Sequence, residues 1–463
     1  MIDLGSAALA DVSQSLQARE VSAAELVRAY LARIEALEPR INSYITVLGE
    51  QALAAAAESD RRLAGGEARG PREGVPLAVK DLLDVVGAPT SNGIGAWRER
   101  MARSDAEVVR RLKAAGAVIL GKLNMHECAL GGTNDNPHFG KCRNPWQPDY
   151  VPGGSSGGSG ASVAAGLCAG SLGTDNMGSV RIPAAFCGIA GLKPTNGLVG
   201  MAGMAQLSWS TATIGPMCKG VDGVALLMGV LAGDDPGSPY SRPAPQPLDF
   251  VLPEAPGING LRVGVLEGLL EEPPEADVAA AFDEALRRFA DLGAELRPLQ
   301  LPEMPRARLE CLLIIESEGG QALAEQLDDP AHPLSEQVHK MLAYGRGMPT
   351  RKLVQAHHYQ FVLRNRVARL WREVDVLLAP VSPLAPFRFE QGEPPQMAGY
   401  MPLANLCGLP GLAVPMGFSG AGLPIGMQIV GAPFADAQVL AVGKAYETTT
   451  DWHLRQAPLA QLG

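Results

Sequence analysis

The feature that most constrains this chain is a glycine- and serine-rich stretch at residues 153–195, GGSSGGSGASVAAGLCAGSLGTDNMGSVRIPAAFCGIAGLKPT. Glycine reaches backbone angles and close approaches that are closed to other residues, so glycines around a serine predict special turns. Between two such clusters, residues 161–169 are small and apolar and predict a buried helix that ends at residues 170–173. The second cluster presents Ser179 after a run of backbone N–H groups, which acyl transfer needs to hold a tetrahedral oxyanion.

An upstream lysine strengthens this interpretation. Lys80 follows the apolar run at residues 75–79 and precedes Asp81, which predicts the end of a mostly buried strand. Burial disfavours the ammonium form and lowers the pKa of a lysine from its reference value near 10.4. A neutral lysine can then act as the base that a serine hydroxyl needs to become a nucleophile.

Together these motifs resemble those of the amidase signature family. Lys80, the GGSSGGS at residues 153–159 and the Asp-x-x-Gly-Ser-x-Arg at residues 175–181 stand in the order and spacing of that family. The resemblance continues through GLPGLAVP at residues 408–415 and GLPIGMQIVG at residues 422–431. It therefore spans nearly the whole chain.

The resemblance implies a role for each member of a Ser-Ser-Lys triad. Ser179 corresponds to the nucleophile, Ser155 to the serine that relays its proton, and Lys80 to the general base. The family also has a cis peptide at the position between Gly154 and Ser155, which aims the relay serine at both partners.

The turn that carries the nucleophile departs from the family pattern. Where the family usually has Asp-Thr-Gly-Gly-Ser or a close variant, this chain has Asp175, Asn176, Met177, Gly178 and Ser179. The implied oxyanion donors are the backbone N–H groups of Asn176, Met177, Gly178 and Ser179, which a change of side chain need not abolish. A positive φ at position 177 would strain a methionine there.

The loop at residues 131–148 is rich in turn-forming residues and leads into the first serine cluster, so we expect it to border the site. Asp135 and Asn136 are candidates for substrate contacts. An equal alternative is that their side chains form hydrogen bonds that stabilise turns. Gly154 and Met177 are the other substrate-binding candidates, and Met177 is expected to reshape the pocket wall.

Other motifs in the same region predict no different chemistry. His126, Glu127 and Cys128 lack the second histidine of H-E-x-x-H, so we expect no metal. Ser156 stands in a G-x-S-x-G, but no apolar run precedes it to form the strand that a nucleophile elbow follows. The same glycines do not predict a phosphate-binding loop, because the lysine of the G-x-x-x-x-G-K-[ST] motif is missing. No cofactor is implied.

Composition limits the partners and the compartment. The 463 residues carry a net charge of −10 and no basic tract, which argues against a nucleic-acid surface. The start of the sequence has no cationic segment before an apolar core and predicts no signal peptide, and no tract predicts a membrane span. Seven scattered cysteines without a C-x-x-C pair favour a reduced, cytoplasmic protein.

The predicted fold is α/β, with a central, mixed, twisted β-sheet covered by helices on both faces, as the resemblance also implies. Residues 1–463 are predicted to form one amidase signature domain, with a helical arm at about residues 1–65 packed on the core. Helical patterns at residues 23–37 and 50–63 belong to that arm. A strand, helix and strand pattern follows between residues 261 and 299.

The predicted function is hydrolysis of a linear C–N amide bond in a small substrate, with release of ammonia or an amine. One branch of the family, the glutaminase subunit of a tRNA-dependent amidotransferase, has an acidic residue at a position that corresponds to Ala398 or a neighbour in this chain. That loss favours a free amidase, similar to the 1-carboxybiuret hydrolase of s-triazine breakdown, which shares NMxE, CRNP and GGSSGGSG patterns.

An inactive scaffold and the glutaminase subunit stay as alternatives. For the quaternary structure, both a homodimer and a complex with a small GatC-like partner subunit stay open. Substrate selectivity is expected to vary at residues 302–348.

Overall fold

The computed structural model describes residues 2–331 and 333–462. Within them, eleven strands form one sheet in the order β1-β3-β2-β6-β8-β7-β12-β13-β11-β9-β10. Four neighbouring pairs run parallel and six antiparallel, so the sheet is mixed, as predicted. These strands are β1 Tyr44–Val47, β2 Pro76–Lys80, β3 Val118–Leu123, β6 Gly170–Asp175, β7 Ala190–Lys193, β8 Thr213–Cys218, β9 Arg262–Glu267, β10 Glu295–Gln300, β11 Val376–Pro380, β12 Gly411–Phe418 and β13 Pro424–Gly431. A separate two-stranded hairpin consists of β4 Asp135–Asn136 and β5 Gly140–Lys141.

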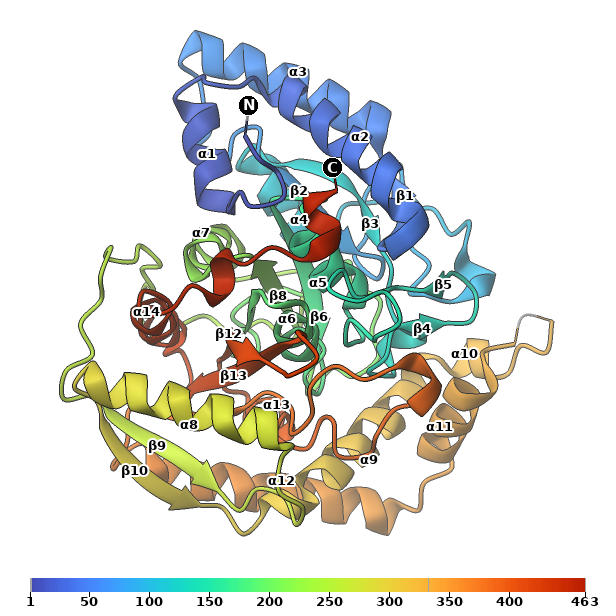
Figure 1. The fold of residues 1–463 in the computed structure, drawn as a ribbon. Coiled ribbons are helices and arrows are strands. Elements are labelled where there is room, and N and C mark those ends of the chain that lie inside the picture. The colour runs from blue at the N-terminus through green and yellow to red at the C-terminus, as the bar shows by residue number, and fades with distance from the viewer. Residues whose placement is uncertain (1, 332, 463) are drawn as a thin grey trace.

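Helices cover both faces of the sheet, which confirms the predicted fold class (Figure 1). They are α1 Leu9–Gln17, α2 Ala23–Ile41, α3 Gly49–Gly65, α4 Glu107–Ala114, α5 Gly157–Ala164, α6 Arg181–Cys187, α7 Val221–Leu231, α8 Ala276–Asp291, α9 Met304–Ala322, α10 Ala324–Leu327, α11 Glu336–Arg346, α12 Thr350–Leu370, α13 Pro402–Cys407 and α14 Asp436–Glu447. No helix in the described part of the chain combines the length and apolar character needed to cross a membrane.

The serine-rich segment lies at the centre of the molecule. In Figure 1, α2 and α3 lie side by side at the end where β1 and β3 are found, and α9, α11 and α12 gather toward the other end. Between these groups, α5 packs against β2, β6 and β8. Every residue of β2 and β6 is buried, as expected for central strands covered on both faces.

Two neighbouring parallel strands position the candidate site. The register of β2 and β6 places Val79 opposite Leu172. Because the carboxyl ends of parallel strands meet at one edge of a sheet, Lys80 at the end of β2 lies near Thr174 and Asp175 at the end of β6.

The helix predicted for residues 161–169 is wrong in its bounds. The helix begins at Gly157 inside the serine cluster and ends at Ala164, and the glycine-rich residues 170–175 form the central strand β6. Glycine has a low intrinsic preference for strands, but β2 and β8 flank β6 and pair with its backbone groups on both sides. The tertiary pairing therefore overrides the local sequence.

Candidate active site

Lys80 is fully buried, and its amine contacts two hydroxyl groups. Its Nζ lies 2.7 Å from Ser155 Oγ and 2.9 Å from Thr174 Oγ1. Burial lowers the pKa of Lys80 well below its ordinary value, although the nearby Asp175 carboxylate opposes that change. The geometry therefore favours a neutral amine that can exchange a proton with Ser155.

Backbone and side-chain contacts fix the loop that carries Ser155. The hydroxyl of Ser156 donates to the carbonyl of Thr174 at 3.1 Å and accepts the N–H of the same residue at 3.2 Å. Asn134 Oδ1 accepts the N–H of Gly157 at 3.0 Å. The Gly154–Ser155 peptide is cis, as expected. Because both hydrogen-bonding directions of Ser156 are engaged, the second serine holds the loop and is not available as a nucleophile.

The carboxylate of Asp175 shapes the turn that carries Ser179. Its Oδ1 accepts the N–H of Gly178 at 2.6 Å, and its Oδ2 accepts the N–H of Val180 at 3.2 Å. Gly178 has φ +104°, and a Cβ there would lie 2.5 Å from Met401 Cγ, so this position requires glycine. The chain therefore folds back around Asp175, and Ser179 in this turn is half-buried.

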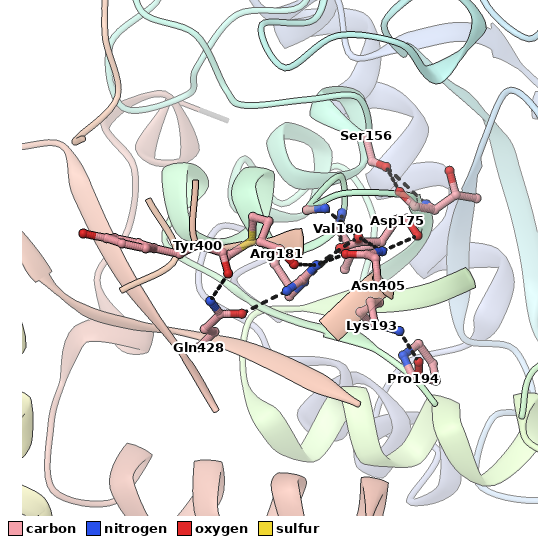
Figure 2. A network of polar contacts seen from close by, with 12 residues as sticks. Ser156, Asp175, Val180, Arg181, Lys193, Pro194, Tyr400, Asn405 and Gln428 are labelled. Carbon is pink, nitrogen blue, oxygen red and sulfur yellow. Dashed lines mark hydrogen bonds and ion pairs between the residues drawn. The ribbon is translucent and has the colours of Figure 1, made fainter. Parts of the chain in front are cut away.

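A buried ion pair supports the Asp175 carboxylate, as Figure 2 shows. Arg181 Nε donates to Asp175 Oδ2 at 3.0 Å, and neither side chain is exposed. Arg181 also donates to Gln428 at 2.9 Å and to Asn405 at 2.6 Å. Burial alone would raise the pKa of Asp175, but the charges of Arg181 and Lys193 and the hydrogen bonds from Arg181 and Asn405 together outweigh burial and keep the pKa below its ordinary value. Asp175 is therefore ionised and shapes the turn.

The backbone donors near Ser179 are only partly free. The N–H of Gly178 is bound to Asp175, which corrects the expectation that it belongs to an oxyanion hole. The N–H groups of Asn176, Met177 and Ser179 donate to no acceptor in the described part of the chain. Met177 does not have a positive φ, so the predicted source of strain does not arise.

A cavity of about 220 Å³ opens beside this turn. Ser179, Gly154, Met177 and Asn176 line it, together with residues of α9, α11 and the segment 393–398. A larger hollow of about 840 Å³ lies between α7 and residues 243–252, but none of the triad residues lines it. The smaller cavity is therefore the candidate substrate pocket.

Two predicted substrate-binding residues have structural contacts instead. Asn136 donates to the carbonyls of Gly93 and Met125, and its oxygen accepts two backbone N–H groups. Asp135 forms an ion pair with Lys141 within the β4–β5 hairpin, and neither Asp135 nor Asn136 lines the cavity. The carboxylate of Asp135 and the amide of Asn136 therefore stabilise the local turns, as the structural alternative predicted.

Thr174, Arg308 and Glu393 are polar residues near the site that the sequence motifs did not identify. Thr174 directly precedes Asp175 in the motif, but its contact with Lys80 depends on strand register. Arg308 and Glu393 line the cavity from segments without any motif, so no local signal identified them. Among the described residues, no cluster of three His, Cys, Asp or Glu side chains could hold a metal ion.

The mixed sheet, the buried lysine and the serine beside partly free N–H groups are typical of a hydrolase that acts on C–N amide bonds. The comparison with protein families agrees, because the model of the family described as Amidase matches residues 25–440. The chain belongs to the amidase signature family.

Similar proteins cover nearly the whole chain. The A subunit of the glutamyl-tRNA(Gln) amidotransferase of Geobacter sp. (strain M21) is 36% identical over 97% of this chain and 98% of its own length. The corresponding protein of Halorhodospira halophila is 40% identical over 97% of this chain and 98% of its own length. A solved structure, described as a vestigial protein complex that reveals the origins of an s-triazine catabolic enzyme, has a TM-score of 0.89 and 34% identity, covering 96% of this chain and 98% of that chain.

Proposed function

We propose that this chain hydrolyses the amide bond of a small substrate through Ser179, Ser155 and Lys80. One observation supports this proposal above the others. The buried Nζ of Lys80 lies 2.7 Å from Ser155 Oγ, and Ser179 and Gly154, the neighbour of Ser155, line the same cavity.

In the first half of the proposed reaction, Ser179 Oγ attacks the carbonyl carbon of the amide. Its proton passes to Ser155, whose own proton passes to the neutral Nζ of Lys80. The free N–H groups near Ser179 stabilise the oxyanion that forms. When the C–N bond breaks, the proton returns through Ser155 to the leaving nitrogen, and ammonia or an amine departs from an acyl-enzyme.

In the second half, water attacks the acyl-enzyme, and its proton travels to Lys80 along the same relay. The tetrahedral intermediate then breaks its bond to Ser179 Oγ, which recovers a proton, and the carboxylic acid leaves. Lys80 thus begins and ends the cycle as a neutral amine, consistent with the lowered pKa that burial causes.

Two substrate classes fit this chemistry. The similarity to A subunits of the glutamyl-tRNA(Gln) amidotransferase favours glutamine and a role that depends on partner subunits. The comparisons support this role better than the free amidase that sequence reasoning preferred. Ala398 in the cavity and the similarity to the structure associated with an s-triazine catabolic enzyme favour a small free amide or urea.

The inactive-scaffold alternative has less support. It depended on Asn176 and Met177, but Met177 has no positive φ and the contact between Lys80 and Ser155 is present.

A screen for ammonia release over small amides, ureas and glutamine tests the proposal. Each substrate is assayed with the chain alone and with amidotransferase partner subunits added. We expect hydrolysis of at least one class, and glutamine turnover that rises with partner subunits would select the glutaminase role. Failure of every substrate, together with failure of a fluorophosphonate to label Ser179, would overturn the proposal.

A further inference from the structure

The candidate pocket contains an arginine with no protein partner among the described residues. The polar side chains that reach it from outside the serine motifs are Arg308 of α9, Gln337 of α11 and Glu393. Most of the remaining lining is apolar, including Leu312, Ile315 and Met341. A guanidinium in such surroundings is permanently charged and presents five N–H donors.

No residue one turn away from Arg308 on its own helix carries a carboxylate. Residues three and four positions away on a helix can reach each other, and for Arg308 these are Met304, Pro305, Cys311 and Leu312. Across the described part of the chain, Arg308 has no hydrogen bond or ion pair, and its Nε is buried.

Other arginines with a buried Nε that lacks an acceptor differ in this respect. Arg62 pairs with Glu58 at 2.8 Å through another nitrogen, and Arg288 pairs with Glu284 at 3.0 Å. Nearby on α9, Arg306 pairs with Glu310. Arg308 therefore stands out as a half-buried side chain with a buried Nε that lines the cavity and lacks any acceptor among the described residues.

The nearby carboxyl groups of Glu393 and Glu316 do not form ion pairs with Arg308. The side chain of Glu393 is held by the N–H of Gly132, which donates to its Oε2 at 2.7 Å. Burial raises the pKa of Glu393, and burial likewise raises the pKa of Glu316 on α9 to about 7, although Arg308 opposes both changes. Neither carboxyl group comes within ion-pair distance of Arg308, so the guanidinium stays available to a ligand.

We propose that Arg308 binds a carboxylate of the substrate while Ser179 attacks its amide carbonyl. The inference rests on the proposed function and narrows the substrate class to amides or ureas that carry a carboxylate. Arginine suits this role because its planar guanidinium can bind both carboxylate oxygens at once. Glutamine and small carboxylated ureas both belong to this class, and the assay separates them.

The kinetic test compares matched charged and uncharged substrates. The probes are succinamate, glutaramate, allophanate and glutamine, with the methyl esters of succinamate and glutaramate as uncharged counterparts. We expect kcat/KM to favour each carboxylate over its ester by about 10- to 100-fold, as a charge-assisted contact provides. Arg308→Gln should bring that ratio close to one, and Arg308→Lys should keep part of it. Arg306→Gln is the matched control and should keep the ratio.

A binding measurement tests Arg308 independently of turnover. Calorimetry with glutaramate and succinamate is performed on Ser179→Ala and on Ser179→Ala/Arg308→Gln. We expect affinity for at least one of the two to fall about 10- to 100-fold in the double variant. Equal affinity, or a charge preference that survives Arg308→Gln, would overturn the inference. If Arg308-dependent binding occurs while no substrate is hydrolysed and Ser179 stays unlabelled, the proposed catalysis fails and the carboxylate site stands.

Discussion

The Nζ of Lys80 lies 2.9 Å from the hydroxyl oxygen of Thr174 on the neighbouring strand. Ser155 Oγ lies 2.7 Å from the same nitrogen. A neutral amine can donate an N–H to Thr174 and direct its lone pair at Ser155, so two hydroxyl groups define one orientation of the base. Thr174 is therefore a candidate positioning residue for Lys80.

Replacement of Thr174 by valine should lower turnover by about tenfold, because the amine loses one of its two orienting contacts. The same change removes an acceptor that stabilises the ammonium form, so the pKa of Lys80 should fall further. Pre-steady-state rates measured against pH check both effects. Thr174→Ser restores the hydroxyl and should recover most of the rate, whereas a purely structural role for Thr174 would leave the pH profile unmoved.

Lys80→Met should lose about 100- to 10,000-fold in turnover while the fold is retained, because it removes the proposed general base but keeps an apolar stem. Ammonia release and circular dichroism measure the two properties. Lys219→Met is the control, because Lys219 is also buried, with a pKa lowered to about 8 by burial, but contacts Leu4 and Gly5. Near wild-type hydrolysis by Lys80→Met would refute the role of Lys80.

The pH profile of kcat/KM should rise with pH through an apparent pKa below 10.5, the ordinary value for lysine, and level off above that pKa. Below that pKa, Lys80 is an ammonium without a lone pair and cannot accept the proton from Ser155. Because burial lowers the pKa of Lys80, the active neutral form persists to lower pH than for an exposed lysine. Initial rates between pH 5 and about 11 test this, and a rise centred at or above the ordinary lysine value would contradict it.

Ser179→Ala should abolish covalent labelling by a fluorophosphonate, since it deletes the proposed nucleophile. Ser155→Ala should slow labelling by at least about 100-fold, because the relay to the base is lost. Mass spectrometry of the labelled peptide reads both results. Ser162→Ala serves as the control, because its hydroxyl bonds within α5 to the carbonyl of Ser159 at 3.2 Å. Continued labelling of Ser179→Ala at the same peptide would rule out the assignment.

Asp175→Asn should lower the free energy of unfolding by about 3–5 kcal/mol, because it leaves the buried Arg181 without its counter-ion. Asp375→Asn breaks a pair at 2.6 Å with Arg262 that is partly exposed and should cost no more than about 1 kcal/mol. Urea denaturation compares the two variants. Similar losses in both would mean that burial of the Asp175 pair contributes little.

Motif spacing predicted much of the frame of this protein. The apolar run before Lys80 identified a buried strand end, and the pattern between residues 261 and 299 identified β9, α8 and β10. These predictions succeeded because hydrophobic periodicity and helix length are local properties. The glycine-rich strand β6 was mistaken for the end of a helix, because its conformation depends on partners distant in sequence.

The sequence by itself determined the family, the mixed α/β fold and the three residues proposed for the triad, since these depend on residue types in a fixed order. Only the tertiary structure decided what surrounds them. Strand register brings Thr174 to Lys80, and the folding of α9 over the serine turn brings Arg308 into the pocket. Such contacts join residues far apart in the chain, and the burial that results, which no local pattern encodes, sets the protonation of Lys80.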